Sequence, residues 1–249
     1  MKKLFAIVCA LVLALSLSAS ALAADITTIE EGKFIYSTSP DFPPFEYTDD
    51  DDNIIGIEPE IIDLICEAIG LTAEPYAVDF DSALEAPQQG KSDAVVSGVT
   101  VREDRKLVFD FTDTSISIVQ AIVFKEGADI SMDNLGDQII GVQRGTTGQI
   151  YTEEDYGEDH VVGYDTYSLV FQALLNGQID CIVMDDAVAK AYVDKNPGLT
   201  MVQTTYEPED FAFGIAKGNT ALVDAFNEQL SILKENGTLQ AIIDKYMAE

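Results

Sequence analysis

Basic residues, histidine and cysteine are all scarce in this chain of 249 residues. Lysine and arginine together number 14 against 44 acidic residues, which gives a formal net charge of -30 at pH 7. So acidic a protein repels nucleic acid and anionic lipid, and we expect neither as a partner. The only histidine, His160, has no nucleophile or metal-ligating partner beside it in the sequence and is predicted to lie on the surface.

The 23 N-terminal residues show the three zones of a secretory signal peptide. Lys2 and Lys3 precede an apolar run at residues 4–17, and residues 21–23 supply the small residues of a cleavage site. A membrane anchor is the competing interpretation, but the run is about 14 residues long and a spanning helix needs roughly 20. Residues 1–23 are therefore predicted to be removed, which leaves a periplasmic or otherwise extracytoplasmic protein of 226 residues.

Cysteine occurs at only three positions. Cys9 lies in the N-terminal apolar run without the Leu-small-small-Cys pattern of a lipoprotein, so no lipid anchor is expected. Cys66 falls in a helical pattern and Cys181 in an apolar strand pattern. An exported protein can bridge such a pair. These two resemble core residues of separate parts of the fold, however, and we expect free thiols.

The most informative stretch is DAVVSGVTVREDRKLVFDFTD, residues 93–113. Its start predicts a short strand buried on both faces. Ser97, Thr100 and Arg105 follow, beside backbone amides that we expect to be exposed. Ligands of open α/β sheets bind past the carboxyl ends of strands, and an arginine fork fits a carboxylate, so the stretch predicts a small-anion site. In the alternative, Arg105 pairs with an acidic neighbour on a solvated helix: Glu103, Asp104 or Asp110.

This stretch resembles the signature run of the family 3 solute-binding proteins, approximately S-G-M-T-I-T-P-E-R between two strands. Those proteins are extracytoplasmic receptors that deliver polar amino acids to ABC transporters. The resemblance implies that four residues contact the ligand: Ser97, Gly98, Thr100 and Arg105. Two departures are visible, because Arg102 replaces the usual threonine and Thr114-Ser115 replaces Pro-Tyr.

Two further segments of the N-terminal half match the family. Residues 33–47, KFIYSTSPDFPPFEY, predict a buried strand and then a loop stiffened by its prolines. The family's Y/F-x-P-F-E segment lines the pocket, which implies that Phe42 does so here, while Ser39 stands where receptors for cationic amino acids commonly have an acidic residue. Residues 80–93 predict a helix that leads back to the signature stretch through a Gly-Lys turn, and Phe80 takes the position of a second pocket aromatic. The alternatives are loop packing for Phe42 and helix-start packing for Phe80.

The acidic run at residues 49–53 invites a calcium interpretation. Four residues match ligand positions of an EF-hand loop: Asp49, Asp51, Asn53 and Glu60. The match fails at Ile54, because the loop needs a glycine there for its sharp turn. We therefore expect an acidic hairpin tip and no metal.

A second α/β pattern is inserted into the first. The run from Ile118 is long enough to cross to another lobe, and the run at 210–219 returns. Strands are predicted between them at 139–143, 161–165 and 179–185, with helices at 166–177 and 186–196. The chain closes with predicted helices at 222–237 and 239–247. The resemblance implies an α/β, two-lobed periplasmic-binding-protein fold of type II, with these parts: lobe one at 24–118 and 212–249, lobe two at 119–211, and hinge crossings near 118–124 and 205–213.

Two places in the second lobe are implied to face the first. The turn GTTGQ at 145–149 makes a helix N-terminus, which favours anions, although G-T-T also makes an ordinary cap. The family closes this turn over the ligand carboxylate, and the implied contacts are Gln143, Thr146 and Thr147. Asp185 takes the acidic position that binds the α-ammonium group. Its alternative role is a helix N-cap, which Asp186 could also fill.

The matching segments occur in the family's order over the whole mature chain. They predict a monomeric receptor without a cofactor that closes on a free amino acid and passes it to the membrane permease of an ABC transporter. An uncharged ligand side chain is expected, because Ser39 supplies no charge and Arg102 or Arg144 would have to turn inward to bind an anion.

Two other functions stay open. Cyclohexadienyl dehydratases share this fold, but elimination needs a proton donor in the cleft, and His160 is not placed to be one. A ligand-sensing domain is the other class, although we expect no transmembrane segment or output domain after Glu249.

Overall fold

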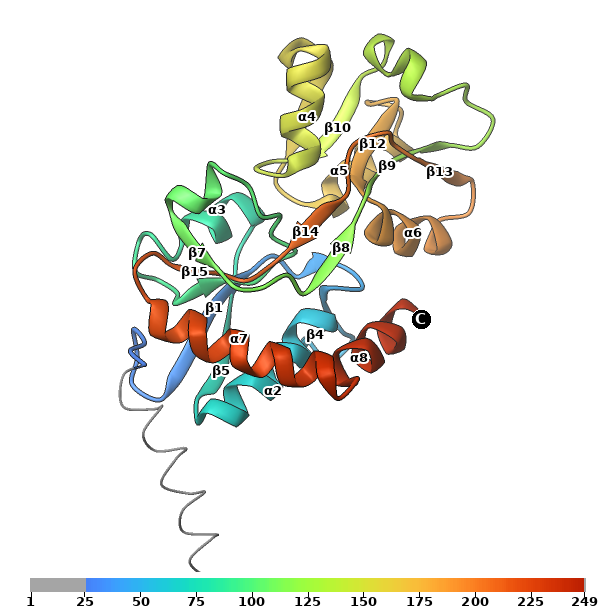
Figure 1. Cartoon of the computed structure of the whole chain (residues 1–249). Helices are drawn as coiled ribbons and strands as arrows, with labels where there is room; N and C mark the ends of the chain where they lie inside the picture. The colour runs from blue at the N-terminus through green and yellow to red at the C-terminus, as the bar shows by residue number, and fades with distance from the viewer. Residues whose placement is uncertain (1–25, 249) are drawn as a thin grey trace, which may run out of the picture.

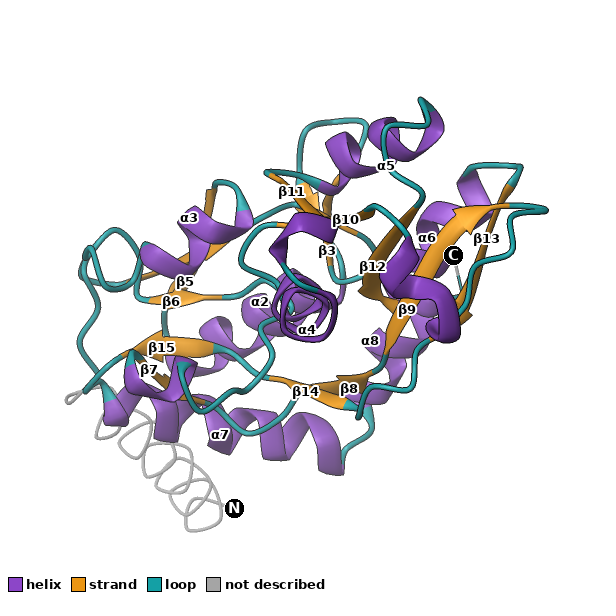
Figure 2. Ribbon diagram, turned by 90° about the horizontal axis from the view of Figure 1, so that it is seen from above, coloured by secondary structure: helices purple, strands orange, loops and turns teal. Residues whose placement is uncertain are grey.

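The computed structural model describes residues 26–248, and in them the chain forms two α/β lobes (Figure 1). The signal peptide predicted at residues 1–23 lies outside the described residues. Each lobe contains a five-stranded sheet with helices packed around it (Figure 2). The prediction of an α/β fold with two lobes is confirmed.

The sheet of the first lobe shows that the second lobe is an insertion. Its strands are, in order, β5 (Thr72–Ala77), β1 (Lys33–Thr38), β6 (Ala94–Val95), β15 (Gly214–Ala216) and β7 (Phe109–Phe111). β1 is parallel to β5 and β6, whereas β15 is antiparallel to β6 and β7. Since β15 follows the whole second lobe in the sequence, the chain leaves the first sheet after β7 and returns to it.

The sheet of the second lobe has both predicted and additional elements. Its strands are, in order, β11 (Val161–Tyr164), β10 (Ile140–Gln143), β12 (Cys181–Asp185), β9 (Gln120–Lys125) and β13 (Leu199–Gln203). Three helices accompany it: α4 (Thr147–Tyr156), α5 (Tyr167–Leu175) and α6 (Asp186–Lys195). β13 and the body of α4 were not among the predicted elements. β9 is antiparallel to both of its neighbours, β12 and β13.

Two short strands connect the lobes. β8 (Ile116–Ile118) and β14 (Glu209–Phe211) pair in antiparallel fashion, and they lie side by side between the two larger sheets (Figures 1 and 2). The first crossing comes slightly earlier than the predicted 118–124, because residues 120–125 already belong to β9 in the second sheet. The boundaries of the lobes stay a prediction.

The helices of the first lobe follow the apolar periodicity of the sequence. α2 (Ile57–Ile69) buries Ile57, Ile61 and Ile65 on one face and ends at Gly70, whose φ of 80° is left-handed. α2 contacts the two closing helices, α7 (Thr220–Glu235) and α8 (Thr238–Met247). The helix predicted from Phe80 is shorter than expected, because α3 (Phe80–Glu85) ends before Pro87. Pro87, which lacks an amide hydrogen, follows its end.

A small hairpin next to β1 carries the acidic run. β2 (Asp41–Phe42), β3 (Glu46–Thr48) and β4 (Ile54–Ile55) form a three-stranded sheet, and residues 49–53 make the turn between the last two strands. Asp49 Oδ1 accepts hydrogen bonds from the backbone nitrogens of Asp51 and Asn53. The prediction of an acidic hairpin tip is confirmed.

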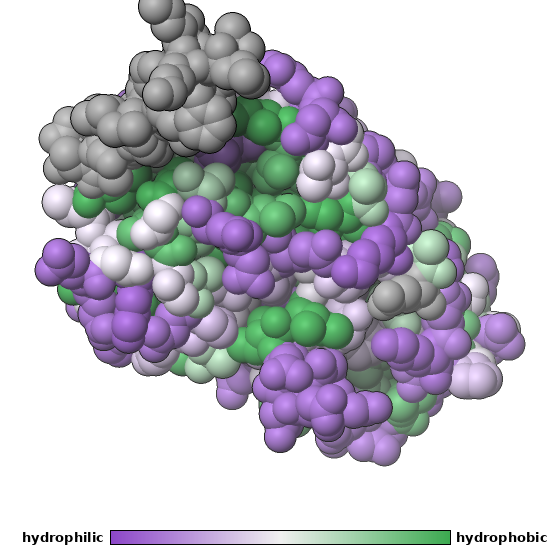
Figure 3. Space-filling view, turned by 90° about the horizontal axis from the view of Figure 1, so that it is seen from below, coloured by the Kyte–Doolittle hydropathy of each residue, from purple (hydrophilic) through white to green (hydrophobic). Residues whose placement is uncertain are grey.

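Cys66 and Cys181 are buried free cysteines, as predicted, and lie in α2 and β12 of different lobes. Burial raises the pKa of each thiol to about 12. His160 is only partly exposed, at the end of a 3-10 turn. The face of the first lobe that points away from the second is largely hydrophilic, with smaller hydrophobic areas (Figure 3). None of the helices at residues 26–248 is long and apolar enough to cross a membrane.

Candidate functional site

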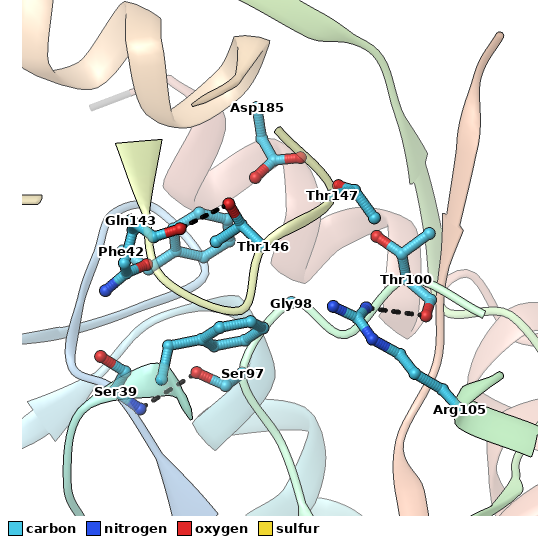
Figure 4. A pocket seen from close by; sticks show the side chains of 11 residues that line it. Ser39, Phe42, Ser97, Gly98, Thr100, Arg105, Gln143, Thr146, Thr147 and Asp185 are labelled. Atoms are coloured by element: carbon cyan, nitrogen blue, oxygen red, sulfur yellow. Dashed lines mark hydrogen bonds between the residues drawn. The ribbon is translucent and has the colours of Figure 1, made fainter. Parts of the chain in front are cut away.

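The residues predicted to contact a ligand surround one cavity between the lobes (Figure 4). About 300 Å³ of empty space lies there, part of it open to solvent. All eleven predicted residues line the cavity: Ser39, Phe42, Phe80, Ser97, Gly98, Thr100, Arg105, Gln143, Thr146, Thr147 and Asp185. Their contacts with a ligand stay a prediction.

Arg105 approaches the cavity from the first lobe. It begins a 3-10 turn after β6, is only 7% exposed, and points its guanidinium group into the space between the lobes (Figure 4). Nη1 donates to the carbonyl oxygen of Thr100 at 3.0 Å, and Nη2 donates to that of Gly145 in the second lobe at 2.9 Å. Burial and the nearby Arg102 lower the pKa of Arg105 to about 10, so it is charged at neutral pH and has further N–H groups to offer.

The alternative pairing of Arg105 with an acidic neighbour is wrong. Each of those neighbours has another cation: Glu103 pairs with Lys106 at 2.6 Å, Asp104 with Arg102 at 3.0 Å, and Asp110 with Lys217 at 2.6 Å. Within residues 26–248, Arg105 is thus a buried cation that belongs to no ion pair and donates its hydrogen bonds to neutral carbonyl groups. Such a charge is costly unless an anion accompanies it.

The second lobe presents a helix N-terminus to the same cavity. Thr146 is the N-cap of α4; its hydroxyl accepts from the backbone nitrogen of Gln149 at 3.3 Å and donates to the carbonyl oxygen of Gln143 at 2.8 Å. Thr147 and Gly148 begin the helix, where backbone amides have no intrahelical acceptor. The predicted helix N-terminus at 145–149 is confirmed, and its location favours an anion.

Asp185 approaches the cavity from the end of β12 and is 6% exposed. It occupies the N-cap position of α6, but its side chain makes no capping hydrogen bond. Oδ1 instead accepts from Nε2 of Gln120 at 2.7 Å. Burial, and next the nearby Glu209, raise the pKa of Asp185 well above its usual range. The cap alternative is therefore wrong for this side chain, which is a buried carboxyl group facing a cavity.

Two aromatic rings form part of the wall. The ring centroid of Phe42 lies 5.8 Å from that of Tyr167 in the second lobe. The ring centroid of Phe80 lies 5.8 Å from the guanidinium carbon of Arg105. Both are buried, at 6% and 5% exposed. Each ring thus packs into its surroundings, as the alternatives proposed, and also lines the cavity.

Comparison with known proteins agrees with this arrangement. Residues 34–249 match the family described as bacterial extracellular solute-binding proteins, family 3. The chain belongs to this family. It is 33% identical over 213 residues to an arginine-binding periplasmic protein of Mannheimia haemolytica, a match that covers 84% of this chain and 88% of that protein.

Two other similar proteins are also binding proteins by name. A putative ABC transporter arginine-binding protein 2 of Escherichia coli (strain K12) is 30% identical over 251 residues, and the match covers 99% of each chain. The solved structure of an ancestral arginine-binding protein bound to glutamine has a TM-score of 0.84 and 34% identity, covering 88% of this chain and all of that one. These names describe binding proteins rather than enzymes.

One expectation about the residues that line the cavity is wrong. The backbone amide of Gly98 was predicted to be exposed, but it donates to Oε2 of Glu58 at 3.0 Å. The hydroxyl of Ser97 is also occupied: it accepts from the backbone nitrogen of Ser39 at 3.0 Å and donates to Oε1 of Glu46 at 2.8 Å. The Ser97-Gly98 turn is therefore held from below by two buried carboxyl groups.

Sequence reasoning missed several residues that support the site. Glu58 lies three and seven residues before Ile61 and Ile65, so its place on the apolar face of α2 was visible in the sequence. Gln120 interrupts an apolar strand, which also signals a special role. Glu209, which accepts from the hydroxyl of Thr100 at 2.6 Å, is one of several acidic residues in its segment and gave no such signal.

Proposed function

We propose that this solute-binding protein is an exported, periplasmic or otherwise extracytoplasmic monomer that binds a free amino acid between its lobes. It then delivers the amino acid to the membrane permease of an ABC transporter. One observation carries this proposal: a buried cation, Arg105, and a buried carboxyl group, Asp185, face one cavity from opposite lobes. A zwitterion supplies the charge that each of them lacks.

The α-carboxylate fits at Arg105 and the N-terminus of α4. The remaining guanidinium N–H groups, the hydroxyl of Thr147 and the first amides of the helix are the donors available there. Charge-assisted hydrogen bonds of this kind are about twice as strong as neutral ones. The α-ammonium group fits at Asp185, since none of the ion pairs among the described residues includes that carboxylate.

An uncharged polar side chain is the first candidate for the rest of the ligand. Ser39 and Gln143 offer neutral hydrogen-bonding groups, and Phe42 and Phe80 offer ring surface. An anionic side chain is disfavoured, because Arg102 pairs with Asp104 and Arg144 pairs with Asp165 instead of lining the cavity. The similar ancestral protein bound to glutamine supports this class.

Arginine is the second candidate, and Asp41 is the observation that favours it. Its carboxylate accepts from the hydroxyl of Ser39 at 3.1 Å, directly behind the cavity wall. A guanidinium group bound at Ser39 therefore has a negative charge close by, which the sequence comparison at position 39 alone did not reveal. The arginine-binding names of similar proteins support the same choice.

Ligand size requires the lobes to close. A free amino acid has about 10 heavy atoms, and micromolar affinity corresponds to about -8 kcal/mol, or roughly -0.8 kcal/mol per atom. Contacts from one lobe alone would hardly supply this. We therefore propose that the lobes rotate about β8 and β14, and that the ligand is enclosed in the closed form.

A thermal-shift screen of the 20 amino acids, followed by calorimetry with the best ligand, tests the proposal. Stabilisation by glutamine or another uncharged polar amino acid is expected, with Arg105→Ala as the variant that loses it. Stabilisation by arginine or lysine alone would reject the first ligand class in favour of the second. Turnover of prephenate or arogenate would instead establish a dehydratase, and no shift with any amino acid would refute the receptor function.

A further inference from the structure

Two buried carboxyl groups without a cation lie directly under the proposed ligand site. Glu46 of β3 is 0% exposed and Glu58, in the first turn of α2, is 1% exposed. Neither takes part in any ion pair among the described residues. A buried, unpaired carboxylate costs several kcal/mol or more, and two adjacent ones cost more still. Some feature of the site must offset this cost.

One oxygen of each carboxyl group holds a residue of the cavity wall. Glu46 Oε1 accepts from the hydroxyl of Ser97 at 2.8 Å, and Glu58 Oε2 accepts from the backbone nitrogen of Gly98 at 3.0 Å. The pair therefore fixes both residues of the turn that lines the cavity. It makes this contact from the side opposite the ligand.

The other oxygen of each group shows how the pair avoids two adjacent charges. Glu46 Oε2 and Glu58 Oε1 are buried and have no hydrogen-bond partner within residues 26–248. The two carboxyl groups are neighbours, because they contact the adjacent residues Ser97 and Gly98 of one turn. Two ionised carboxylates can only accept hydrogen bonds, so both oxygens would stay unsatisfied. One proton between them satisfies both and removes one negative charge, as in other carboxyl pairs that share a site.

We propose that Glu46 and Glu58 share one buried proton and act as a positioning pair for the Ser97-Gly98 turn, so that loss of this proton weakens ligand binding. The part that concerns binding rests on the proposed function. The shared proton itself does not, because it is argued from the burial and contacts of the two carboxyl groups alone.

The surroundings of the pair support retention of the proton. Burial, and next the neighbouring Glu58, raise the pKa of Glu46 well above its usual range, and burial raises the pKa of Glu58 to about 7. The titratable groups that face the pair from adjoining elements are Tyr36 of β1, Asp41 of β2 and Asp185 of β12. All of them are neutral or negative, so none stabilises a second carboxylate.

The sign of the pH dependence follows from these raised pKa values. The folded protein binds the proton more tightly than the unfolded chain, in which glutamate has a pKa of about 4.3. The stability that the pair contributes is therefore fully present below about pH 4.3 and is lost as the pH rises through the folded values. We expect both the unfolding free energy and ligand affinity to fall between pH 6 and pH 8.5.

The decisive comparison is between Glu46→Gln and Glu46→Ala. The glutamine amide keeps an oxygen for the hydroxyl of Ser97 and places a permanent N–H where the shared proton was, facing Glu58. Affinity at pH 6 should therefore stay within about threefold of wild type, and the fall toward pH 8.5 should disappear. Glu46→Ala removes both contacts and should weaken binding more than tenfold at every pH. Glu67→Gln, on the exposed part of α2, is the matched control.

Calorimetry with glutamine and with arginine as probes, together with urea unfolding of the same variants without ligand, measures these effects. The α-ammonium group of a free amino acid also titrates toward pH 8.5, so the difference between wild type and Glu46→Gln is the informative quantity. The positioning role would be overturned if the ligand affinity of Glu46→Gln still fell toward pH 8.5 as in wild type. Wild-type affinity in Glu46→Ala would overturn it as well. If neither probe binds, the proposed function or its ligand class is at fault. The unfolding profiles then still decide, because an equal pH dependence in wild type and Glu46→Gln would refute the shared proton.

Discussion

The carboxylate of Asp41 accepts a hydrogen bond from the backbone nitrogen of Tyr167 at 2.7 Å, and this bond joins the two lobes beside the cavity. Tyr167 is the first residue of α5, where an anion is favoured. The hydroxyl of Tyr192 also donates to the carbonyl oxygen of Asp41, at 2.9 Å. Asp41 therefore holds the lobes together through contacts that do not include the ligand.

Asp41→Ala is expected to shift the protein toward an open form. The lost charge-assisted bond is worth about 1.5 to 3 kcal/mol, and each 1.4 kcal/mol is about a factor of ten in affinity. Ligand binding should weaken by roughly 10- to 100-fold. Calorimetry and small-angle scattering measure the two effects. Asp51→Ala, at the exposed hairpin tip, should change neither; equal affinities of the two variants would show that Asp41 does not hold the lobes.

The sequence predicted the residues of the cavity better than the contacts beneath them. Arg105 and Asp185 were recognised because a family signature and the ends of two strands mark their positions. The occupied amide of Gly98 was missed, because it depends on Glu58, which is 40 positions away in the sequence and meets Gly98 only after α2 packs on the sheet. Periodicity shows which face of a helix is buried. It does not show which atom a buried carboxylate contacts.

Errors in the predicted elements have a similar cause. The helix predicted from Phe80 stops at Glu85, because Pro87 ends a pattern that otherwise continues. Among the described strands, β13 pairs only with β9, at the edge of the sheet. A strand at the edge of a sheet needs neither full burial nor strict alternation, so Leu199–Gln203 gave a weak signal. The long apolar pattern of α7 was predicted correctly, since its burial is repeated over several turns.

Arg105 and Asp185 should differ in what their loss does. Arg105→Ala removes the cation expected to hold the α-carboxylate in the open form and leaves that charge unpaired, so binding should become too weak to measure. Asp185→Ala should retain weak binding while the protein stays open, because only the closed form gains the ammonium contact. Calorimetry and scattering distinguish the two. Arg102→Ala serves as the control; wild-type affinity and closure in Asp185→Ala would rule out the ammonium site.

The contribution of Asp185 to ligand affinity should rise with pH as its carboxyl group ionises. Its raised pKa means that the carboxyl group is neutral below that value and pairs poorly with an ammonium group. Glu209→Gln removes a nearby negative charge, lowers the pKa of Asp185 and should move the rise to lower pH, while the amide oxygen still accepts from Thr100.

Calorimetry from pH 5 to 8, in buffers of different ionisation enthalpy, counts the protons released on binding. The exposed Glu207→Gln is the control. A profile that is unchanged in Glu209→Gln would show that Glu209 does not influence Asp185. Ionisation of Asp185 should raise ligand affinity as the pH increases, whereas loss of the proton shared by Glu46 and Glu58 should lower it. The Glu209 and Glu46 variants therefore separate the two effects.

Gly98→Ala should damage both stability and binding. Gly98 has a φ of +56°, and an added Cβ would lie 2.4 Å from Cε1 of Phe42 and 3.1 Å from Cε2 of Phe211. The left-handed backbone costs an alanine about 1 to 2 kcal/mol, and overpacking adds roughly 1 to 3 kcal/mol. Because Phe42 lines the cavity, its displacement should also weaken ligand binding more than tenfold.

Gly127→Ala separates the backbone cost from the packing cost. Gly127 has a φ of +84° with no atom within 4 Å of an added Cβ, so only the backbone cost of about 1 to 2 kcal/mol should remain. Urea unfolding and calorimetry of both variants give the comparison, and Gly127→Ala should bind the ligand as wild type does. Suppose that Gly98→Ala also bound the ligand as wild type does and was as stable as Gly127→Ala. The ring of Phe42 would then move freely, and it could not be a fixed wall of the ligand site.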